Sequence, residues 1–589
     1  MKTFTGIPAS SGIAAAKALV YVENERLSIP HFSITEAEIP AEWERLQKAL
    51  KEAAGELRDL HKRAKSQMGR EQADIFKAQL LMLDDDDFKD QLKDRLKKSL
   101  HNADWVIWDM SHELSQKLMQ SPDPALRERA VDIADVSYRI IDCLFGSTDG
   151  SSSLAGLDED VILVAHNLMP SDTLIMDKSR VKGIALDEGS STCHTAILAR
   201  AFNIPAVLGL SDFSREVRDG EMLTLNGTSG IVVINPDKRT LTKQKNEEKI
   251  HRKQSDRLVA LRDLPAETTD GHRVTIKANI GLPEEVEKVL SFGAEGIGLY
   301  RTEFLFITPG MAAEEEAQYH AYSHVLKTMG NLPVTIRTVD VGGDKVVPEL
   351  QTAIEQHDSE KNPLLGWRAM RLSLANPELF KVQLRAILRA SVHGNVRIMF
   401  PMISGIEELE QARVLLDEAR AECKKKRQSF SDAIDVGVMI EVPSAAMTAD
   451  ILAEKSDFLS IGTNDLIQYT LAVDRGNEKV NYLNESHHPA VLRFLKRIID
   501  SAHDRGIKAA MCGELAGDPL AAGILVGLGL DEFSMAASSF LPIKQIIRGT
   551  SLKSCKRLAV EALRSRSIEE IRAVVNAWMA EYAPSQHGI

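Results

Sequence analysis

The sequence DEGSSTCHTAILARAFNIPAVLG, residues 187–209, predicts a turn, a short helix and a strand in that order. Small residues precede His194, and the spacing of Ile197, Leu198 and Phe202 favours a helix that starts at the histidine. An asparagine and a proline then end the helix. Because a helix N-terminus presents free backbone N–H groups and a dipole that favours negative charge, we expect a neutral His194 that accepts a phosphoryl group. The alternative is a histidine that only caps the turn.

Short apolar segments on either side of this stretch predict a compact α/β subdomain. Gly, Pro and Asp residues separate the segments, as is typical of short strands joined by turns. Residues 1–23 contain a Gly- and Ser-rich turn and a further strand, which we expect to complete the same sheet as residues 145–237. The strands predicted after residue 150 are 161–165, 183–186, 205–210 and 230–235.

Residues 24–144 have the pattern of an antiparallel helical bundle inserted into that subdomain. From Trp43 to Leu60, apolar residues recur at spacings of three, four and seven, with charged residues between them. Further helices are predicted over residues 71–83, 88–100, 103–118 and 124–144.

Residues 238–262 are almost wholly polar and favour helix, which predicts a linker helix between two bodies that move. Residues 263–589 then repeat strand–helix units and predict a (β/α)₈ barrel. The strands are near-continuous apolar runs, as expected of a parallel sheet buried on both faces. The predicted strands are 274–280, 296–300, 334–340, a weak one at 364–369, 396–402, 437–442, 457–462 and 508–513.

The carboxyl ends of these strands carry the residues that we expect to do chemistry, because active sites of such barrels lie there. Arginine suits bidentate binding of phosphate and carboxylate, and carboxylates on adjacent strands suit Mg²⁺. We therefore predict a small anion with phosphate and carboxylate groups, bound together with a divalent metal. The residues concerned are Arg301, Arg337, Lys345, Arg368, Glu441, Asn464, Asp465, Arg475 and Cys512.

Each of these residues also has a plainer interpretation. A single arginine at a strand end usually makes an ion pair, and small buried cysteines such as Cys512 are common in strands. The convergence of several cations with two carboxylates favours a site over scattered ion pairs. His487 and His488 precede a proline in a loop, and we expect them to be surface residues without a role.

Composition restricts the partners. The chain has 589 residues, 72 Lys and Arg against 85 Asp and Glu, and a net charge of −13, which argues against nucleic acid or an anionic membrane as the main partner. Its five cysteines have no paired spacing, which indicates a reducing compartment. The absence of a long apolar run or an apolar N-terminal core predicts a cytoplasmic protein without membrane insertion.

Long motifs resemble one known family, enzyme I of the bacterial phosphoenolpyruvate-dependent sugar phosphotransferase system. The resemblance covers nearly the whole chain, with the motifs in the same order. They are TCHTAILARAFNIPAVLG (192–209), GAEGIGLYRTEFLF (293–306), TVDVGGDK (338–345), NPLLGWRAMR (362–371), VMIEVPSAA (438–446), SIGTNDLIQYTLAVDRGN (460–477) and MCGELAGD (511–518).

The resemblance implies the architecture and the partners. It implies a swivelling α/β phosphohistidine subdomain of residues 1–23 and 145–237, and a helical insertion of residues 24–144 that binds the phosphocarrier protein HPr. The linker helix of residues 238–262 leads to a (β/α)₈ barrel of residues 263–589, which binds phosphoenolpyruvate and forms a homodimer.

The resemblance also implies roles for individual residues. His194 becomes the phosphohistidine, Thr173 orients it, and Cys512 protonates the enolate to give pyruvate. Glu441 and Asp465 hold Mg²⁺. The substrate is held by Arg301, Arg337, Arg475, Asn464, Arg368 and, at the rim, Lys345.

The chain departs from the family before the histidine, where GSSTCH replaces the usual GGRTSH, so that Ser191 stands in the place of an arginine. This turn resembles that of phosphoenolpyruvate synthases, and a synthase or a pyruvate phosphate dikinase is the alternative enzyme. Such enzymes need an ATP-binding domain, and no Gly-rich nucleotide loop is evident before His194. Two further alternatives are a non-catalytic regulatory relative and an enzyme I of the nitrogen branch.

Overall fold

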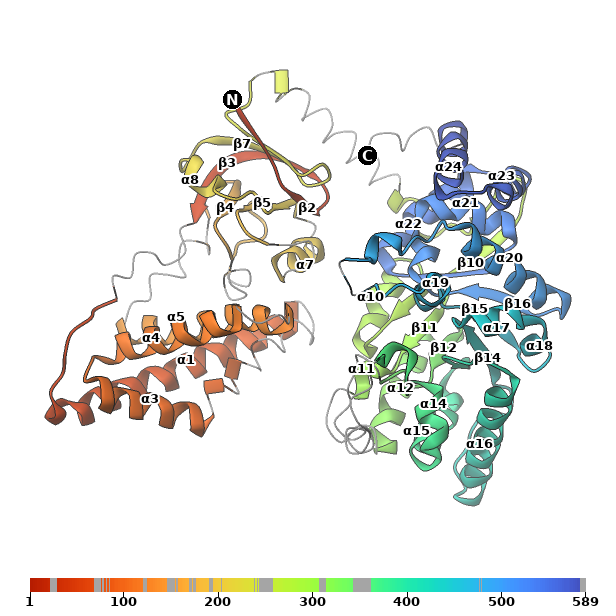
Figure 1. Ribbon diagram of the computed structural model, residues 1–589, viewed down its shortest axis with the longest axis horizontal. Helices are drawn as coiled ribbons and strands as arrows, with labels where there is room; N and C mark the ends of the chain where they lie inside the picture. The colour runs from red at the N-terminus through yellow and green to blue at the C-terminus, as the bar shows by residue number, and fades with distance from the viewer. Residues whose placement is uncertain are drawn as a thin grey trace. The chain divides into compact units, whose positions relative to one another are not determined.

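The structure is a computed structural model of the chain, which divides into two compact units, Met1–Gln254 and Ser255–Gly588 (Figure 1). Each unit is described by itself. The structure describes all residues except 22–28, 68–75, 77–78, 81, 84, 120–123, 146–153, 155–156, 169–171, 173–175, 190–193, 203, 238, 241, 243–257, 307–313, 343–361, 476, 478 and 583–589.

The first unit contains an eight-stranded mixed sheet in the order β1-β8-β7-β3-β4-β5-β6-β2. The pairs β3–β4, β4–β5 and β5–β6 are parallel, and the other pairs are antiparallel. The strand at 222–226 was not predicted. The strands are β1 (Lys2–Thr5), β2 (Ile7–Ser10), β3 (Ile13–Tyr21), β4 (Val161–Ala165), β5 (Val181–Leu186), β6 (Ala206–Leu208), β7 (Met222–Asn226) and β8 (Ile231–Ile234).

Side chains alternate across this sheet and build one apolar layer on each face. Leu163 of β4 packs in the layer that includes Ala196 and Ala199 of helix α7 (His194–Ala201). Ile162 packs in the opposite layer, with Phe213 of helix α8 (Phe213–Glu216). Helix α7 is therefore held on one face of the sheet, in the connection between β5 and β6.

The described residues between 29 and 145 form the predicted helical bundle around an apolar core that includes Leu46, Leu57 and Leu92. Its described helices are α1 (Ile39–Gln67), α3 (Asp86–Ser99), α4 (Ala103–Met119) and α5 (Pro124–Phe145). Most of the predicted helix at 71–83 and of the predicted linker helix at 238–262 lies outside the described residues.

The second unit is a closed barrel of eight parallel strands, as the sequence predicted. Strand β17 closes it by pairing with β10, and β9 (Ala266–Glu267) adds an antiparallel pair. The barrel strands are β10 (Arg273–Ile280), β11 (Ile297–Arg301), β12 (Val334–Arg337), β13 (Val396–Phe400), β14 (Asp435–Ile440), β15 (Phe458–Ile461), β16 (Lys508–Met511) and β17 (Glu532–Met535).

The helices that surround the strands bury an apolar core against them. They are α10 (Val286–Ser291), α11 (Glu303–Phe306), α12 (Glu315–Met329), α14 (Met370–Ala375), α15 (Pro377–Ala390), α16 (Ile406–Lys425), α17 (Pro443–Met447), α18 (Ala449–Ala453), α19 (Thr463–Leu471), α20 (Pro489–Asp504), α21 (Pro519–Leu528), α22 (Phe540–Gly549), α23 (Leu552–Arg564) and α24 (Ile568–Tyr582).

The identity of one barrel strand was predicted wrongly. Residues 364–369 are not a strand but a short 3₁₀ turn (Pro363–Leu365) and a bend, while the eighth strand is β17, which the sequence did not suggest. Glu441 therefore follows the fifth barrel strand, Asp465 the sixth and Cys512 the seventh.

His487 was also predicted wrongly, because its side chain is buried, with 6% exposed, and hydrogen-bonds to the Ser486 hydroxyl. Over the residues that the structure describes, none of the helices has both the length and the apolar character needed to cross a membrane.

Candidate functional site

The carboxyl ends of the barrel strands surround a cavity of about 400 Å³, a size typical of small-molecule sites. Its lining brings together most of the site residues predicted from the sequence. They are Arg301, Arg337, Arg368, Glu441, Asn464, Asp465, Arg475 and Cys512.

The cavity is less cationic than the sequence suggested. Three further carboxylates line it, those of Glu303, Asp340 and Glu514, so the described lining has four arginines and five acids. Each follows a predicted site residue by two or three positions at the same strand end, and the sequence analysis assigned it no role. The arginines are therefore divided between pairing with carboxylates and binding a ligand.

Arg337 is a buried arginine whose two Nη atoms both contact carboxylates. Its Nη2 atom donates to Oε1 of Glu303 at 2.6 Å, and its Nη1 lies 3.1 Å from Oδ2 of Asp340. Arg337 is 5% exposed, Glu303 4% and Asp340 1%. Pairing compensates the cost of burying these charges, since an unpaired charge at such a position is strongly unfavourable.

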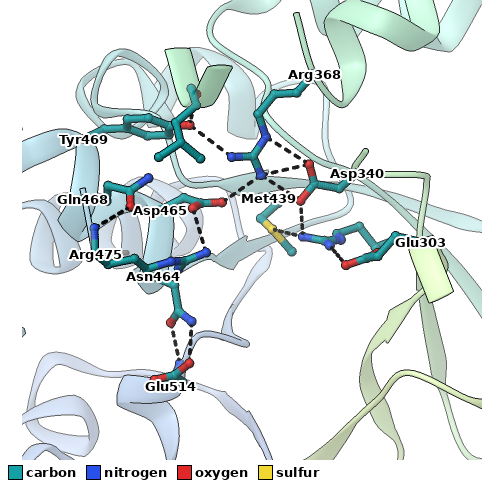
Figure 2. Close-up of polar contacts among 12 residues, drawn as sticks. Glu303, Asp340, Arg368, Met439, Asn464, Asp465, Gln468, Tyr469, Arg475 and Glu514 are labelled. Atoms are coloured by element: carbon teal, nitrogen blue, oxygen red, sulfur yellow. Dashed lines mark hydrogen bonds and ion pairs between the residues drawn. The ribbon is translucent and has the colours of Figure 1, made fainter. Parts of the chain in front are cut away.

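Arg368 is engaged at all three guanidinium nitrogens (Figure 2). Its Nε and Nη2 donate to Oδ1 of Asp340 at 3.3 and 3.0 Å, and Nη2 also lies 3.4 Å from Oδ2 of Asp465. Its Nη1 donates to the hydroxyl of Tyr469 at 3.3 Å. Arg368 thus joins the end of β12 to helix α19.

Arg301 and Arg475 are the arginines with donors to spare. Within the described part of the chain, Arg301 makes no ion pair or hydrogen bond through its guanidinium, although it lines the cavity. Arg475 makes one long ion pair, Nη2 to Oδ1 of Asp465 at 3.5 Å, and its side chain is 40% exposed. An entering anion finds these two guanidinium groups open for charge-assisted hydrogen bonds.

Glu441 and Asp465 provide a pair of buried carboxylates, 2% and 6% exposed. Oε1 of Glu441 accepts the backbone N–H of Met402 at 2.6 Å. Burial, followed by the charges of Asp465 and Asp340, raises the pKa of Glu441 well above its usual range. Oδ1 of Asp465 is buried and accepts no hydrogen bond from a described residue.

This donor set fits Mg²⁺, which typically binds one or two carboxylates and completes its shell with water and substrate oxygens. No cluster of three or more His, Cys, Asp or Glu side chains among the described residues is arranged to hold a metal by itself. The two buried carboxylates are suited to bind a cation, since Oδ1 of Asp465 has only the 3.5 Å ion pair with Arg475, but they do not form a closed cage.

Asn464 and Cys512 are held by neighbouring side and main chains. The Asn464 amide donates to Oε1 of Glu514 and accepts the Glu514 N–H, both at 2.9 Å. The Ser460 hydroxyl donates to Sγ of Cys512 at 3.3 Å. Burial raises the pKa of the Cys512 thiol to about 11, so it carries its proton at neutral pH.

The remaining predicted residues lie elsewhere or outside the described part. His194 is the first residue of α7, as the sequence predicted, but its side chain is outside the described part. The carboxylate of Asp187, in the same connection, accepts the backbone N–H of Ser214 at 2.8 Å. Thr173 and Lys345 are both outside the described residues.

Known protein families match the chain along most of its length. The model described as "PEP-utilising enzyme, PEP-binding domain" matches residues 255–552. Those described as "PEP-utilising enzyme, N-terminal" and "PEP-utilising enzyme, mobile domain" match residues 5–129 and 157–230.

Curated relatives match from end to end. A protein of Staphylococcus carnosus named phosphoenolpyruvate-protein phosphotransferase is 41% identical over 98% of this chain and 99% of its own. Proteins of the same name from Geobacillus stearothermophilus and Listeria monocytogenes are also 41% identical, over 98% of this chain and 98% and 100% of their own.

Proposed function

The chain belongs to the phosphoenolpyruvate–protein phosphotransferase family, and from this premise we propose the steps of its reaction. The enzyme takes the phosphoryl group of phosphoenolpyruvate and releases pyruvate, as the first step of the sugar phosphotransferase system. We place the phosphoryl group first on His194 and then on the histidine of the phosphocarrier protein HPr. The observation that carries this proposal is the barrel cavity, in which two open arginines face two buried carboxylates.

Arg301 and Arg475 bind the substrate phosphate, because the Arg301 guanidinium has no partner among the described residues and that of Arg475 has only the 3.5 Å ion pair with Asp465. Arg337 has an unpaired Nε atom and adds positive charge to the cavity. Asn464, whose amide is fixed by Glu514, and Arg368 place the rest of the substrate. Lys345 adds a positive charge at the rim. Catalysis is then mainly positioning and charge neutralisation.

Glu441 and Asp465 would hold Mg²⁺, and Oδ1 of Asp465, which is buried and accepts no hydrogen bond from a described residue, would be one of the ligands. The bound ion would supply positive charge against the substrate phosphate and carboxylate. With five acids and four arginines, the described lining alone does not provide the excess of positive charge that a trianionic substrate requires.

Cys512 delivers the proton that converts the enolate of pyruvate into pyruvate. Its thiol is protonated at neutral pH and lies beside Leu299 and Met439 in an apolar layer of the barrel. The Ser460 hydroxyl donates toward the sulfur and stabilises the thiolate that remains after the proton leaves. A buried donor also keeps bulk water from competing for the enolate.

His194 receives the phosphoryl group at the N-terminus of α7, where backbone N–H groups favour the added negative charge. Thr173 orients the imidazole. The phosphorylated subdomain, residues 1–23 and 145–237, then swivels about the linker helix at 238–262 to HPr, which docks on the helical insertion at 24–144. The barrel, residues 263–589, forms the homodimer, and the enzyme works in the cytoplasm.

The test is to incubate the purified chain with Mg²⁺ and phosphoenolpyruvate labelled in its phosphoryl group, and then to add HPr. The proposal expects label on the chain without ATP, one pyruvate for each phosphoryl group taken up, and passage of the label to HPr. Binding of ATP by the chain would point instead to a phosphoenolpyruvate synthase. A chain that takes no label would be a regulatory relative.

A further inference from the structure

We propose that Asp340 is a positioning residue that sets the places of Arg337, Arg368 and, through Arg368, the carboxylate of Asp465. This inference deepens the proposed function and rests on it. Asp340 stands three residues after Arg337, just past the end of β12, and is 1% exposed.

The two oxygens of Asp340 are shared between two arginines that approach from different segments. Oδ2 lies 3.1 Å from Nη1 of Arg337 and 3.1 Å from Nη2 of Arg368. Oδ1 accepts from Nε and Nη2 of Arg368 at 3.3 and 3.0 Å. A carboxylate between two guanidinium groups offsets their mutual repulsion and fixes the angle between them.

The contact extends from Arg368 to the opposite wall of the cavity. Asp465 and Tyr469 are four residues apart on α19 and therefore share one helix face, and both contact Arg368 (Figure 2). The Tyr469 hydroxyl also donates to the carbonyl of Leu364 at 2.5 Å. A chain of contacts thus runs from Asp340 through Arg368 to the carboxylate that we expect to bind metal.

The backbone around Arg368 packs closely against the segment that follows Asp340. Gly342 has φ +108°, and a Cβ there would lie 2.6 Å from the carbonyl oxygen of Trp367. Ala369 has φ 52° and ψ −123°, a conformation that costs a non-glycine residue free energy, and its N–H donates to the carbonyl of Val341 at 2.9 Å. These close backbone contacts therefore hold Arg368 next to Asp340.

These contacts indicate different roles for the four arginines of the cavity. Protein groups, Asp340 among them, contact every guanidinium nitrogen of Arg337 and Arg368 except Nε of Arg337, so these two arginines chiefly position the site, while Arg301 and Arg475 bind the anion. Removing the Asp340 charge displaces Arg337 and Arg368, but it leaves Arg301 and Arg475 able to bind the anion. The expected loss is therefore in the rate of transfer and in metal binding, with little change in KM for phosphoenolpyruvate.

The decisive variant is Asp340→Asn, which keeps the shape but turns an N–H₂ group toward one of the guanidinium groups. We expect kcat to fall about 100-fold at saturating Mg²⁺, as for a misplacement of about 1 Å, with KM for phosphoenolpyruvate nearly unchanged. We expect the Kd for Mn²⁺, followed by electron paramagnetic resonance without substrate, to rise about tenfold, as for loss of a group that orients a metal ligand.

Asp435→Asn is the matched control. It makes the same chemical change at the start of β14, where the carboxylate is 54% exposed and pairs with Arg397. We expect kcat, KM and Mn²⁺ binding of this variant to equal those of the wild type. Tyr469→Phe removes one contact of Arg368 and should weaken Mn²⁺ binding less than Asp340→Asn. In the double variant Asp340→Asn, Tyr469→Phe, the loss of Mn²⁺ affinity should be smaller than the sum of the two single losses, because both residues act through Arg368.

Unchanged kcat and Mn²⁺ affinity in a folded Asp340→Asn variant would overturn the inference, as would a rise in KM alone. If this variant does not fold, Tyr469→Phe decides, and unaltered Mn²⁺ affinity there would equally overturn it. A wild-type chain that takes no phosphoryl group from phosphoenolpyruvate would defeat the proposed function, whereas the Mn²⁺ measurements would still test Asp340.

Discussion

Nη2 of Arg337 donates to Oε1 of Glu303 across 2.6 Å, with both side chains buried inside the mouth of the barrel. This ion pair distinguishes Arg337 from Arg301, because Arg301 lines the same cavity but has no ion-pair partner among the described residues. The two arginines end adjacent strands and look equivalent in the sequence. Their different partners lead to different expectations for their removal.

For Arg301→Gln, we expect kcat/KM for phosphoenolpyruvate to fall on the order of 10²–10³, since a charged contact to the substrate is lost. The melting temperature should stay that of the wild type, because no carboxylate among the described residues loses an ion-pair partner. Steady-state kinetics and calorimetry on the same preparation measure both quantities. A large loss of thermal stability with normal kinetics would show that Arg301 is a structural residue.

For Arg337→Gln, we expect a fall of about 3–5 kcal/mol in the free energy of unfolding of the barrel, because Glu303 and Asp340 remain buried with their charges less compensated. The double variant Arg337→Gln, Glu303→Gln should recover part of this loss. Denaturant unfolding measures the difference. Equal stability of wild type and single variant would contradict the role assigned to this ion pair.

For Cys512→Ala, we expect pyruvate protonation to slow by about 10²–10⁴, the usual contribution of a positioned acid. The sharpest readout is the exchange of pyruvate methyl protons with D₂O on the enzyme, followed by proton NMR. Ser460→Ala should slow the same exchange less, because it removes only the hydrogen bond to the sulfur. Exchange at the wild-type rate in Cys512→Ala would assign the proton to another donor.

A buried lysine in the barrel, Lys277, leads to a prediction for how the stability of the barrel depends on pH. Burial lowers the pKa of Lys277 to about 8, although its Nζ lies 2.6 Å from Oε2 of Glu532. Since the unfolded-state value is about 10.4, the unfolded chain holds more protons between pH 8 and 10. The penalty of this buried lysine is therefore present at pH 7 and is relieved as pH rises, by at most about 1.4 kcal/mol per pH unit.

Lys277→Met tests this prediction, because Arg397 and Lys508 still lie 3.3 and 3.4 Å from Glu532 in the variant. We expect the barrel of the wild type to gain stability relative to the variant between pH 7.5 and pH 9.5, as measured by calorimetry at both values. Parallel changes in the two proteins would place the pKa of Lys277 near its ordinary value.

The barrel and most of its mouth could be predicted because the strands are apolar runs that end in polar motifs. Strand β17 was not predicted, because its four residues, EFSM, alternate polar and apolar side chains over a short length. The apolar letters LLGWRA suggested a strand at 364–369, but the positive φ of Ala369 turns the chain there. His487 is buried by contacts from distant segments that no local pattern records.

The pairing within the site is what the sequence could not provide. Strand ends indicated where Arg301, Arg337 and Arg368 would gather, but not that Asp340 would pair with two of them. Which arginine stays open depends on side-chain directions across the barrel, which are set by packing and not by spacing along the chain. The roles of the site residues are thus predictions that the experiments above decide.

The central claim is that His194 carries the phosphoryl group. The most direct measurement is mass spectrometry of the chain after incubation with phosphoenolpyruvate and Mg²⁺, beside a His194→Gln variant, with digestion kept at alkaline pH. The account predicts one acid-labile phosphate on the peptide that contains residue 194, and none anywhere on the variant. A phosphorylated His194→Gln chain, or a phosphate on another residue of the wild type, would contradict it.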